Sequence, residues 1–317
     1  MKQAEKVLRL FSAVILTLFF ATGAMAEFPD RPLKIIVPFG SGGETDIVAR
    51  LLAKEMAKEI GENVVVQNIV GASGVVGCKQ VLNAKKDGYT LGVIPSGPLV
   101  MHPYMRKIPY SAESFSYVGR IIKSPYLVFV EKNSPWNTFS EMIDDMKKNP
   151  NKYFWGSSGV GSVPYFAYKN ITSAYGVEVR HVPFHADPDA FQAMAGGRAQ
   201  IYTSTAGTLL KYDIKALAVL DDQRSEELPE VPAISEFGPS VPTSQWIALV
   251  APKGLPEDVL NKLSEIMKKA MESQSIKDSL KRLSLASGYL SPEETLEFVE
   301  KEAETNKVRI PQIMGKK

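Results

Sequence analysis

The sequence is poor in cysteine and histidine, which limits the kinds of site that it can build. Cys78 is the only cysteine among 317 residues, so no intramolecular disulfide can form. Small and apolar residues surround Cys78, which indicates a buried structural thiol, with a reactive or lipidated cysteine as the alternative. The core must therefore be held by packing without covalent cross-links, which a chain of this length can achieve.

The three histidines show no spacing typical of a metal site or of catalysis. They are His102, His181 and His185. His181 and His185 are four residues apart, but Pro183 lies between them in a strand-like segment, which argues against two ligands on one helical face. No acid or nucleophile stands at a recognisable spacing from any of the three. We therefore predict no metal site, no catalytic residue and no cofactor.

An excess of charge is also missing once an N-terminal segment is set aside. Residues 1–26 contain a basic start, an apolar run over residues 10–21 and the small residues Ala24-Met25-Ala26, the pattern of a cleaved secretory signal. The apolar run is short for a membrane-spanning helix, which needs about 20 residues. From Glu27, where a lipoprotein would have cysteine, 34 basic and 34 acidic residues remain. We therefore predict an exported, soluble protein without the basic face that a nucleic-acid binder needs.

The remaining composition is that of a folded globular protein. Hydrophobic residues make up 44% of the chain and charged residues 23%, which argues against disorder. The length allows two domains of ordinary size.

One stretch, residues 33–50, combines a strand, a glycine-rich loop and the start of a helix. The apolar run Ile35-Ile36-Val37 predicts a buried strand, Gly40-Ser41-Gly42-Gly43 follows, and a helical pattern restarts near Thr45 or Asp46. The N-terminus of a helix offers unpaired backbone N–H groups to an anion such as a phosphate, carboxylate or sulfate. The alternative is a tight strand-to-helix connection capped by Thr45 or Asp46.

The same order of elements recurs in the second half of the chain. Residues 153–156 predict a strand, residues 157–162 form a serine- and glycine-rich loop, and residues 163–175 predict a helix. Strands and helices alternate in both halves, so we predict an α/β fold with two doubly wound units. Ligands bind beyond the carboxyl ends of the strands in such sheets. If the units face each other, the two loops converge on one anion in an interdomain cleft.

The chain is predicted to cross between these units twice. Apolar runs at residues 118–122 and 126–130, around Lys123-Ser124-Pro125, predict the first crossing, and the apolar strand at residues 246–251 predicts the return. Two amphipathic helices that follow are expected to pack on the first unit; they span residues 256–271 and 292–305.

These crossings predict one discontinuous lobe with a second lobe inserted in it. After the signal at residues 1–26, the first lobe contains residues 27–124 and 245–317, and the second lobe contains residues 125–244.

Enzyme motifs are missing from both loops. The first lacks the Gly-Lys-Ser/Thr of a P-loop and the third glycine of a dinucleotide-binding loop, and Ser157-Ser158-Gly159 lacks the G-x-S-x-G pattern of a nucleophile elbow. A binding protein therefore fits better than an enzyme. An exported enzyme on the same two-lobed fold and a component that presents its ligand to a membrane sensor are the alternatives.

Short motifs in a specific order resemble the extracytoplasmic solute receptors of tripartite tricarboxylate transporters, also called the Bug family. The resemblance covers nearly all of the chain after the signal. The motifs are Phe28-Pro29-Asp30-Arg31-Pro32, Val37-Pro38-Phe39 with Gly42-Gly43 and Asp46, Asn68 with Gly71, Gly74 and Gly77, Asp87-Gly88-Tyr89-Thr90, Val182-Pro183-Phe184, Gly196-Gly197, Val231-Pro232, and Trp246 with Ala251-Pro252.

The resemblance implies a two-lobed periplasmic-binding-protein fold, type II-like, that closes on a small carboxylate. The receptor would be a periplasmic monomer that delivers this ligand to the membrane components of the transporter. In the family a loop from each lobe grips one carboxylate, partly through ordered waters. By position the first loop would contribute Phe39, Ser41, Gly42, Gly43 and Asp46, and the second Ser157, Ser158, Gly161 and Ser162. Ser96 and the Ser204-Thr205 loop are further candidates.

Three side chains have a structural alternative to ligand binding. A carboxylate at Asp46 would repel a carboxylate ligand unless Asp46 is tied to the N–H groups of its own helix or meets an ammonium or hydroxyl group. Tyr165 and Tyr202 would add aromatic surface for a ligand with a ring or a longer chain, or would belong to the core. The sequence leaves both questions open, together with the identity of the carboxylate.

Overall fold

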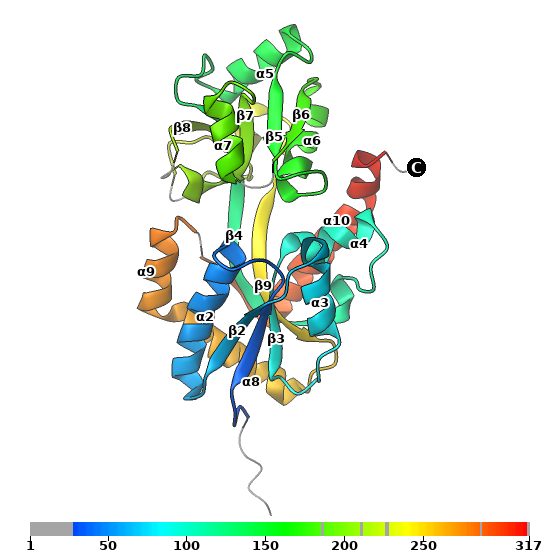
Figure 1. Cartoon of the computed structure of the whole chain (residues 1–317), viewed down its shortest axis with the longest axis vertical. Helices are drawn as coiled ribbons and strands as arrows, with labels where there is room; N and C mark the ends of the chain where they lie inside the picture. Colours follow the sequence, from blue (N-terminus) through cyan, green and yellow to red (C-terminus); the bar gives the residue numbers. More distant parts are fainter. Residues whose placement is uncertain (1–27, 185–186, 210–211, 226–227, 286, 316–317) are drawn as a thin grey trace, which may run out of the picture.

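The computed structural model describes residues 28–184, 187–209, 212–225, 228–285 and 287–315. The predicted signal at residues 1–26 and His185 lie outside the described residues. The chain forms two lobes stacked along its long axis and joined by two long strands (Figure 1). The α/β architecture predicted from the sequence is therefore present.

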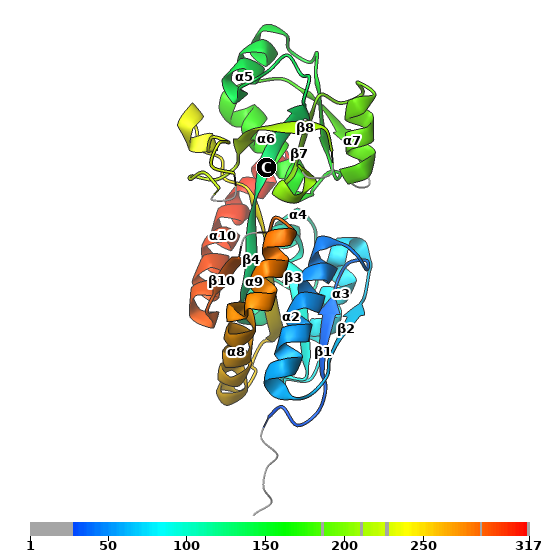
Figure 2. The same cartoon turned by 90° about the vertical axis from the view of Figure 1, so that its left-hand side faces the viewer.

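The first lobe surrounds a sheet with helices on both sides. Its strands are β1 (Leu33–Val37), β2 (Val64–Asn68), β3 (Thr90–Pro95) and β10 (Ser287–Leu290), and its helices are α2 (Glu44–Ile60), α3 (Val75–Leu82), α4 (His102–Met105), α8 (Glu257–Glu272), α9 (Gln274–Arg282) and α10 (Pro292–Ile313). Short helical turns occur at η1 (Ala72–Gly74), η2 (Gly97–Met101) and η3 (Ala112–Ser114). Figure 2 shows α2, α8 and α9 together on one side, and α10 on the other side rising toward the second lobe.

The second lobe repeats the strand-and-helix pattern on a smaller scale. Its strands are β5 (Phe154–Ser157), β6 (Arg180–Pro183), β7 (Ile201–Thr205) and β8 (Ile214–Val219), its helices are α5 (Phe139–Lys148), α6 (Val163–Tyr175) and α7 (Asp187–Ala195), and its short turns are η4 (Ala206–Thr208) and η5 (Ile234–Phe237). The predicted span of α6 agrees with the structure.

Two strands, β4 (Phe115–Glu131) and β9 (Ser244–Pro252), connect the lobes. Strand order along the described sheet is β2-β1-β3-β9-β4-β7-β5-β6, with β8 and β10 also paired to β4. β1 runs parallel to β2 and β3, β5 runs parallel to β6 and β7, and β4 and β9 are antiparallel to each other. Each lobe thus has a parallel unit whose strands end facing the other lobe.

The first crossing is a single strand, and not the two runs that the sequence predicts. Lys123 and Ser124, between those runs, pair with Trp246 and Gln245 of β9, so the ladder continues through them. β4 pairs with β9 up to Pro125 and with β7 from Tyr126 onward. This change of partner lies one residue beyond the predicted division between residues 124 and 125. The lobe boundaries themselves stay a prediction.

The C-terminal region differs most from the expectation. α9 and β10 were not predicted, because only Ile276 and Leu280 give the α9 segment an apolar face. α10 continues to Ile313, eight residues beyond the expected end, since Asn306 and Ile310 extend its buried face. Its Arg309 Nε donates to Asn170 Oδ1 of α6 at 2.8 Å, so α10 contacts both lobes.

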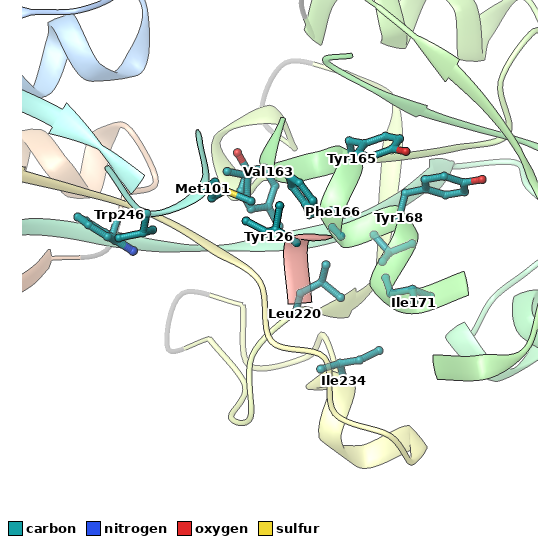
Figure 3. Close-up of a cluster of buried hydrophobic side chains, with 14 of the residues drawn as sticks. Met101, Tyr126, Val163, Tyr165, Phe166, Tyr168, Ile171, Leu220, Ile234 and Trp246 are labelled. Carbon is teal, nitrogen blue, oxygen red and sulfur yellow. The ribbon is translucent and has the colours of Figure 1, made fainter. Parts of the chain in front are cut away.

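Successive residues of β1 face two different cores, as the alternation of a strand requires. Ile35 lies in the core beneath α2, α8 and α9, whereas Ile36 lies in the core that includes Cys78. The second core continues across the junction between the lobes, because Trp246 of β9 lies in one buried cluster with Tyr126 and Val163 (Figure 3).

Cys78 is a free, buried thiol, which agrees with its interpretation as a structural cysteine. Burial raises its pKa to about 12. At neutral pH the thiol is therefore protonated, and a role as a reactive nucleophile is excluded.

No helix in the described part of the chain combines the length and the apolar character that crossing a membrane would require.

Candidate ligand-binding site

The loop between β1 and α2 places glycine where the backbone needs it. Gly42 has φ 83°, a left-handed conformation that glycine adopts easily. Gly43 is the N-cap of α2, which begins at Glu44. The alternative in which Thr45 or Asp46 is the N-cap of this helix is therefore ruled out, because both lie within its first turn. The amides of Gly43 and Thr45 have no hydrogen-bond partner in the described part of the chain, as expected at a helix N-terminus.

The Asp46 carboxylate holds this loop in place. Its Oδ2 accepts from the amide of Gly42 and from Arg50 Nε, both at 2.9 Å, and its Oδ1 accepts from Asn68 Nδ2 at 2.8 Å. Ser41 Oγ donates to Oδ2 at 3.3 Å. The hydrogen bond from Arg50, followed by those from Gly42 and Asn68, holds the pKa of Asp46 well below its usual range despite burial. The side chain is 2% exposed, so the geometry favours the structural role over ligand contact.

The loop between β5 and α6 ends in a side-chain cap. Ser162 Oγ accepts from the Tyr165 amide at 3.2 Å and donates to the Gly159 carbonyl at 2.7 Å. The hydroxyl thereby satisfies one amide of the first helical turn.

The same loop meets the first lobe at Gly161. This residue has φ 88°, and a Cβ atom added to it would lie 2.0 Å from Met105 Cε of α4. Only glycine permits this contact between the lobes. The amides of Gly161 and Val163 make no hydrogen bond to the described residues. The start of α6 therefore offers donors at the point where the lobes meet.

Ser157 and His181 form a contact that the sequence did not suggest. Ser157 Oγ lies 2.7 Å from His181 Nε2, because β5 and β6 are neighbours in the sheet. The Ser157 side chain is fully buried and also bonds the backbone of Gly159, and no carboxylate of the described chain bonds the imidazole. Burial lowers the pKa of His181, which stacks on Tyr168. Because no acid is hydrogen-bonded to His181 in the described chain, the buried contact between Ser157 and His181 stabilises the loop and does not form a catalytic pair.

A cavity of about 560 Å³ lies between the two lobes. Its lining includes residues from the segment after β1, the segment after β3, the second loop, both crossing strands and the C-terminal end of α10. The lining residues are Phe39, Ser73, Pro95, Gly97, Pro98, His102, Met105, Arg106, Tyr126, Ser158, Val160, Gly161, Ser162, Val163, Pro164, Gln245 and Met314.

Four of the predicted ligand-binding residues line this cavity: Phe39, Ser158, Gly161 and Ser162. Nine others are not among its lining residues: Ser41, Gly42, Gly43, Asp46, Ser96, Ser157, Tyr165, Ser204 and Thr205. Tyr165 and Tyr202 are both buried in apolar cores, which supports their structural alternative. Ser96 is 1% exposed and its hydroxyl has no partner among the described residues. Ligand contact by these nine residues stays a prediction.

Several residues that line the cavity were not predicted from the sequence. Tyr126 and Gln245 lie on the crossing strands, where Tyr126 Oη donates to Gln245 Oε1 at 3.0 Å. His102 and Arg106 lie four residues apart, at the start of α4 and directly after its end. The position of the crossings in the sequence could have indicated Tyr126 and Gln245, whereas no sequence signal distinguished Arg106 from other arginines.

The one histidine in the described lining of the cavity, His102, is uncharged at neutral pH. Burial, with Arg106 adding to it, lowers the pKa of His102 to about 4, so this imidazole is neutral at neutral pH. Among the described residues, no group of histidine, cysteine and acidic side chains is arranged to hold a metal ion.

Comparison with known proteins gives a consistent result over most of the chain. Residues 48–314 match the tripartite tricarboxylate transporter family receptor. The protein BugT of Bordetella pertussis is 27% identical over 299 residues, which cover 90% of this chain and 92% of BugT.

Two solved structures from Rhodopseudomonas palustris are also similar. One, solved with adipate, is 28% identical with a TM-score of 0.78, and the match covers 91% of this chain and 99% of that one. The other, MatC with bound malate, is 27% identical with a TM-score of 0.75, and the match covers 89% of this chain and all of MatC. The family is one of solute receptors, not of enzymes. The chain belongs to the tripartite tricarboxylate transporter family of receptors.

Proposed function

We propose that this receptor captures a small carboxylate in the cavity between its lobes and delivers it to the membrane components of a tripartite tricarboxylate transporter. The observation that carries the proposal is the start of α6. Ser162 and Val163 line the cavity, and the amides of Gly161 and Val163 are unpartnered in the described chain. A helix N-terminus with free amides attracts an anion by both its hydrogen-bond donors and its dipole.

The strength of such contacts is sufficient for a transport receptor. A hydrogen bond to a charged group contributes about 1.5–3 kcal/mol net. The dipole at a helix terminus adds about 0.3–1 kcal/mol, or about 2 kcal/mol when it is partly buried. Four or five such interactions offset the costs of association and leave a micromolar complex, near −8 kcal/mol.

The similar structures with bound ligands support the choice of carboxylate. They contain malate and adipate, both small carboxylates. We assign direct ligand contact first to Phe39, Ser158, Gly161 and Ser162, because these predicted residues line the cavity. Export through a signal at residues 1–26, residence in the periplasm as a monomer, and the lobe boundaries at residues 124/125 and 244/245 belong to the same proposal.

A thermal-shift screen of residues 27–317 tests this function. Mono-, di- and tricarboxylates, aromatic acids, amino acids, neutral sugars and cations are added one at a time. A ligand that binds the folded state raises the melting temperature as its concentration exceeds its dissociation constant. We expect at least one carboxylate to give a saturable shift. A shift only with sugars or cations would contradict the proposal.

A further inference from the structure

The cavity has one permanent charge on its wall. Among the described residues that line it, Arg106 is the only arginine, and none is lysine, aspartate or glutamate. The remaining titratable group of this lining besides tyrosine, His102, is neutral at neutral pH because its pKa is lowered to about 4. A charged ligand that enters this cavity therefore encounters a positive charge at one position of its wall, Arg106.

The Arg106 side chain is positioned but not neutralised. Its Nη2 donates to the Ala72 carbonyl at 2.8 Å and lies 3.3 Å from His102 Nδ1. Its Nε and Nη1 have no hydrogen-bond partner, and no carboxylate pairs with it, in the part of the chain that the structure describes. A guanidinium group has five N–H donors in a planar fork. Two of its three nitrogens thus remain available to a carboxylate.

The turn that holds Arg106 is strained. Ala72 and Ser73 both have a positive φ, 47° and 53°, although neither is glycine. Ser73 lines the cavity, and Ala72 accepts the hydrogen bond from Arg106. Conformations of this kind persist where surrounding contacts enforce them, and they gather at ligand-binding sites.

Apolar side chains form part of the remaining wall, beside polar residues such as Ser73, Ser158 and Gln245. Phe39, Pro98, Met105 and Val160 face the same cavity. The Val160 side chain is 61% exposed, the only large apolar residue of the second loop with such exposure. An apolar segment of a ligand would cover this surface, whereas an additional carboxylate placed there would lose its water without gaining a partner.

We infer that Arg106 binds a second carboxylate, so that the preferred ligand is a dicarboxylate with an apolar spacer. One carboxylate lies at the amides of Gly161 and Val163, and the other pairs with Arg106. This inference rests on the proposed function, and it adds the substrate class and the residue that selects it. A tricarboxylate is disfavoured, because the described lining offers no second cation to pair with its third charge.

Isothermal titration calorimetry on the mature chain tests this assignment. Adipate and hexanoate are compared, because they have the same number of carbons and differ by one carboxylate; citrate is the third ligand. The wild-type protein should bind adipate more tightly than hexanoate or citrate. Arg106→Gln should weaken adipate binding by about ten- to a hundredfold, the loss of a hydrogen-bonded charge pair, and change hexanoate binding by less than about threefold.

The matched control is Arg198→Gln, which removes an exposed arginine in the second lobe that does not line the cavity. It should leave all three affinities unchanged. Retained hexanoate binding shows that Arg106→Gln folds. A wild-type protein that prefers citrate or hexanoate, or a variant that weakens adipate and hexanoate equally or leaves both unchanged, overturns the inference while the receptor function stands. Failure of the wild-type protein to bind any carboxylate overturns the proposed function instead.

Discussion

The carboxyl group of Glu302 shows how its surroundings change the chemistry of one side chain. Glu302 lies on α10, where Trp246 Nε1 of the crossing strand donates to its Oε2. Burial raises its pKa from 4.5 to about 7, although the Trp246 bond and the charges of Lys123 and Arg120 oppose this. The folded state therefore holds a proton that the unfolded state has released. The free energy of unfolding therefore falls as the pH rises from 4.5 to about 7, because the carboxyl group ionises in the unfolded state while burial opposes its ionisation in the folded state.

Glu302→Gln should remove this penalty and retain an oxygen acceptor for Trp246. We expect no stabilisation at pH 4, below both pKa values, and a gain at pH 8 of up to about 3 kcal/mol in the free energy of unfolding. Urea denaturation at the two pH values measures this difference. Glu300→Gln, on an exposed position of the same helix, is the control and should change neither value. A variant less stable than the wild-type protein at pH 8 would show that ionised Glu302 stabilises the fold.

The two glycine-rich loops show what a strand-loop-helix pattern can and cannot reveal. The order of strand, loop and helix was predictable because apolar runs end in Gly and Ser segments before a helical pattern. The identity of the cap was not: Gly43 precedes α2, and Asp46 instead binds the loop through contacts with Arg50 and Asn68. The Asn68 partner lies 22 residues away in the chain, so local spacing gives no sign of it.

Gly161→Ala, compared with a matched control, should show whether ligand binding depends on the contact between the second loop and Met105 or on the positive φ of the loop. The added Cβ would meet Met105 Cε at 2.0 Å, so the Met105 side chain, which lines the cavity, would have to move from its present position. We expect carboxylate affinity to fall at least tenfold, as measured by calorimetry, with about 1–2 kcal/mol lost in stability because alanine is forced into a positive φ.

The matched control for this change is Gly159→Ala in the same loop. Gly159 also has a positive φ, 97°, but an added Cβ would meet nothing within 4 Å. It should lose similar stability and keep its affinity. Equal losses of affinity in the two variants would mean that strain in the loop, and not the contact with Met105, controls binding.

The whole molecule was predictable in outline because its crossings are long apolar strands. The runs at residues 118–122 and 126–130 and at residues 246–251 correspond to β4 and β9. The two helices predicted after the return crossing correspond to α8 and α10. These patterns are local, so the sequence alone reveals them.

The cavity wall was less predictable, because it is assembled from segments far apart in the chain. Phe39, Arg106, Ser162 and Met314 meet only after the lobes are placed against each other. Helical or strand periodicity in the sequence carries no information about contacts between segments that lie far apart in the chain. The residues that the sequence analysis identified in the cavity are those of the glycine- and serine-rich loops, and Arg106 required the structure.

A crystal structure of residues 27–317 with a bound carboxylate would show directly where the ligand binds. We expect a ligand between the lobes, with one carboxylate at the start of α6 and its oxygens about 2.7–3.2 Å from the amides of Gly161 or Val163. A ligand bound outside the interlobe cavity, or one whose carboxylate makes no contact with α6, would contradict this expectation.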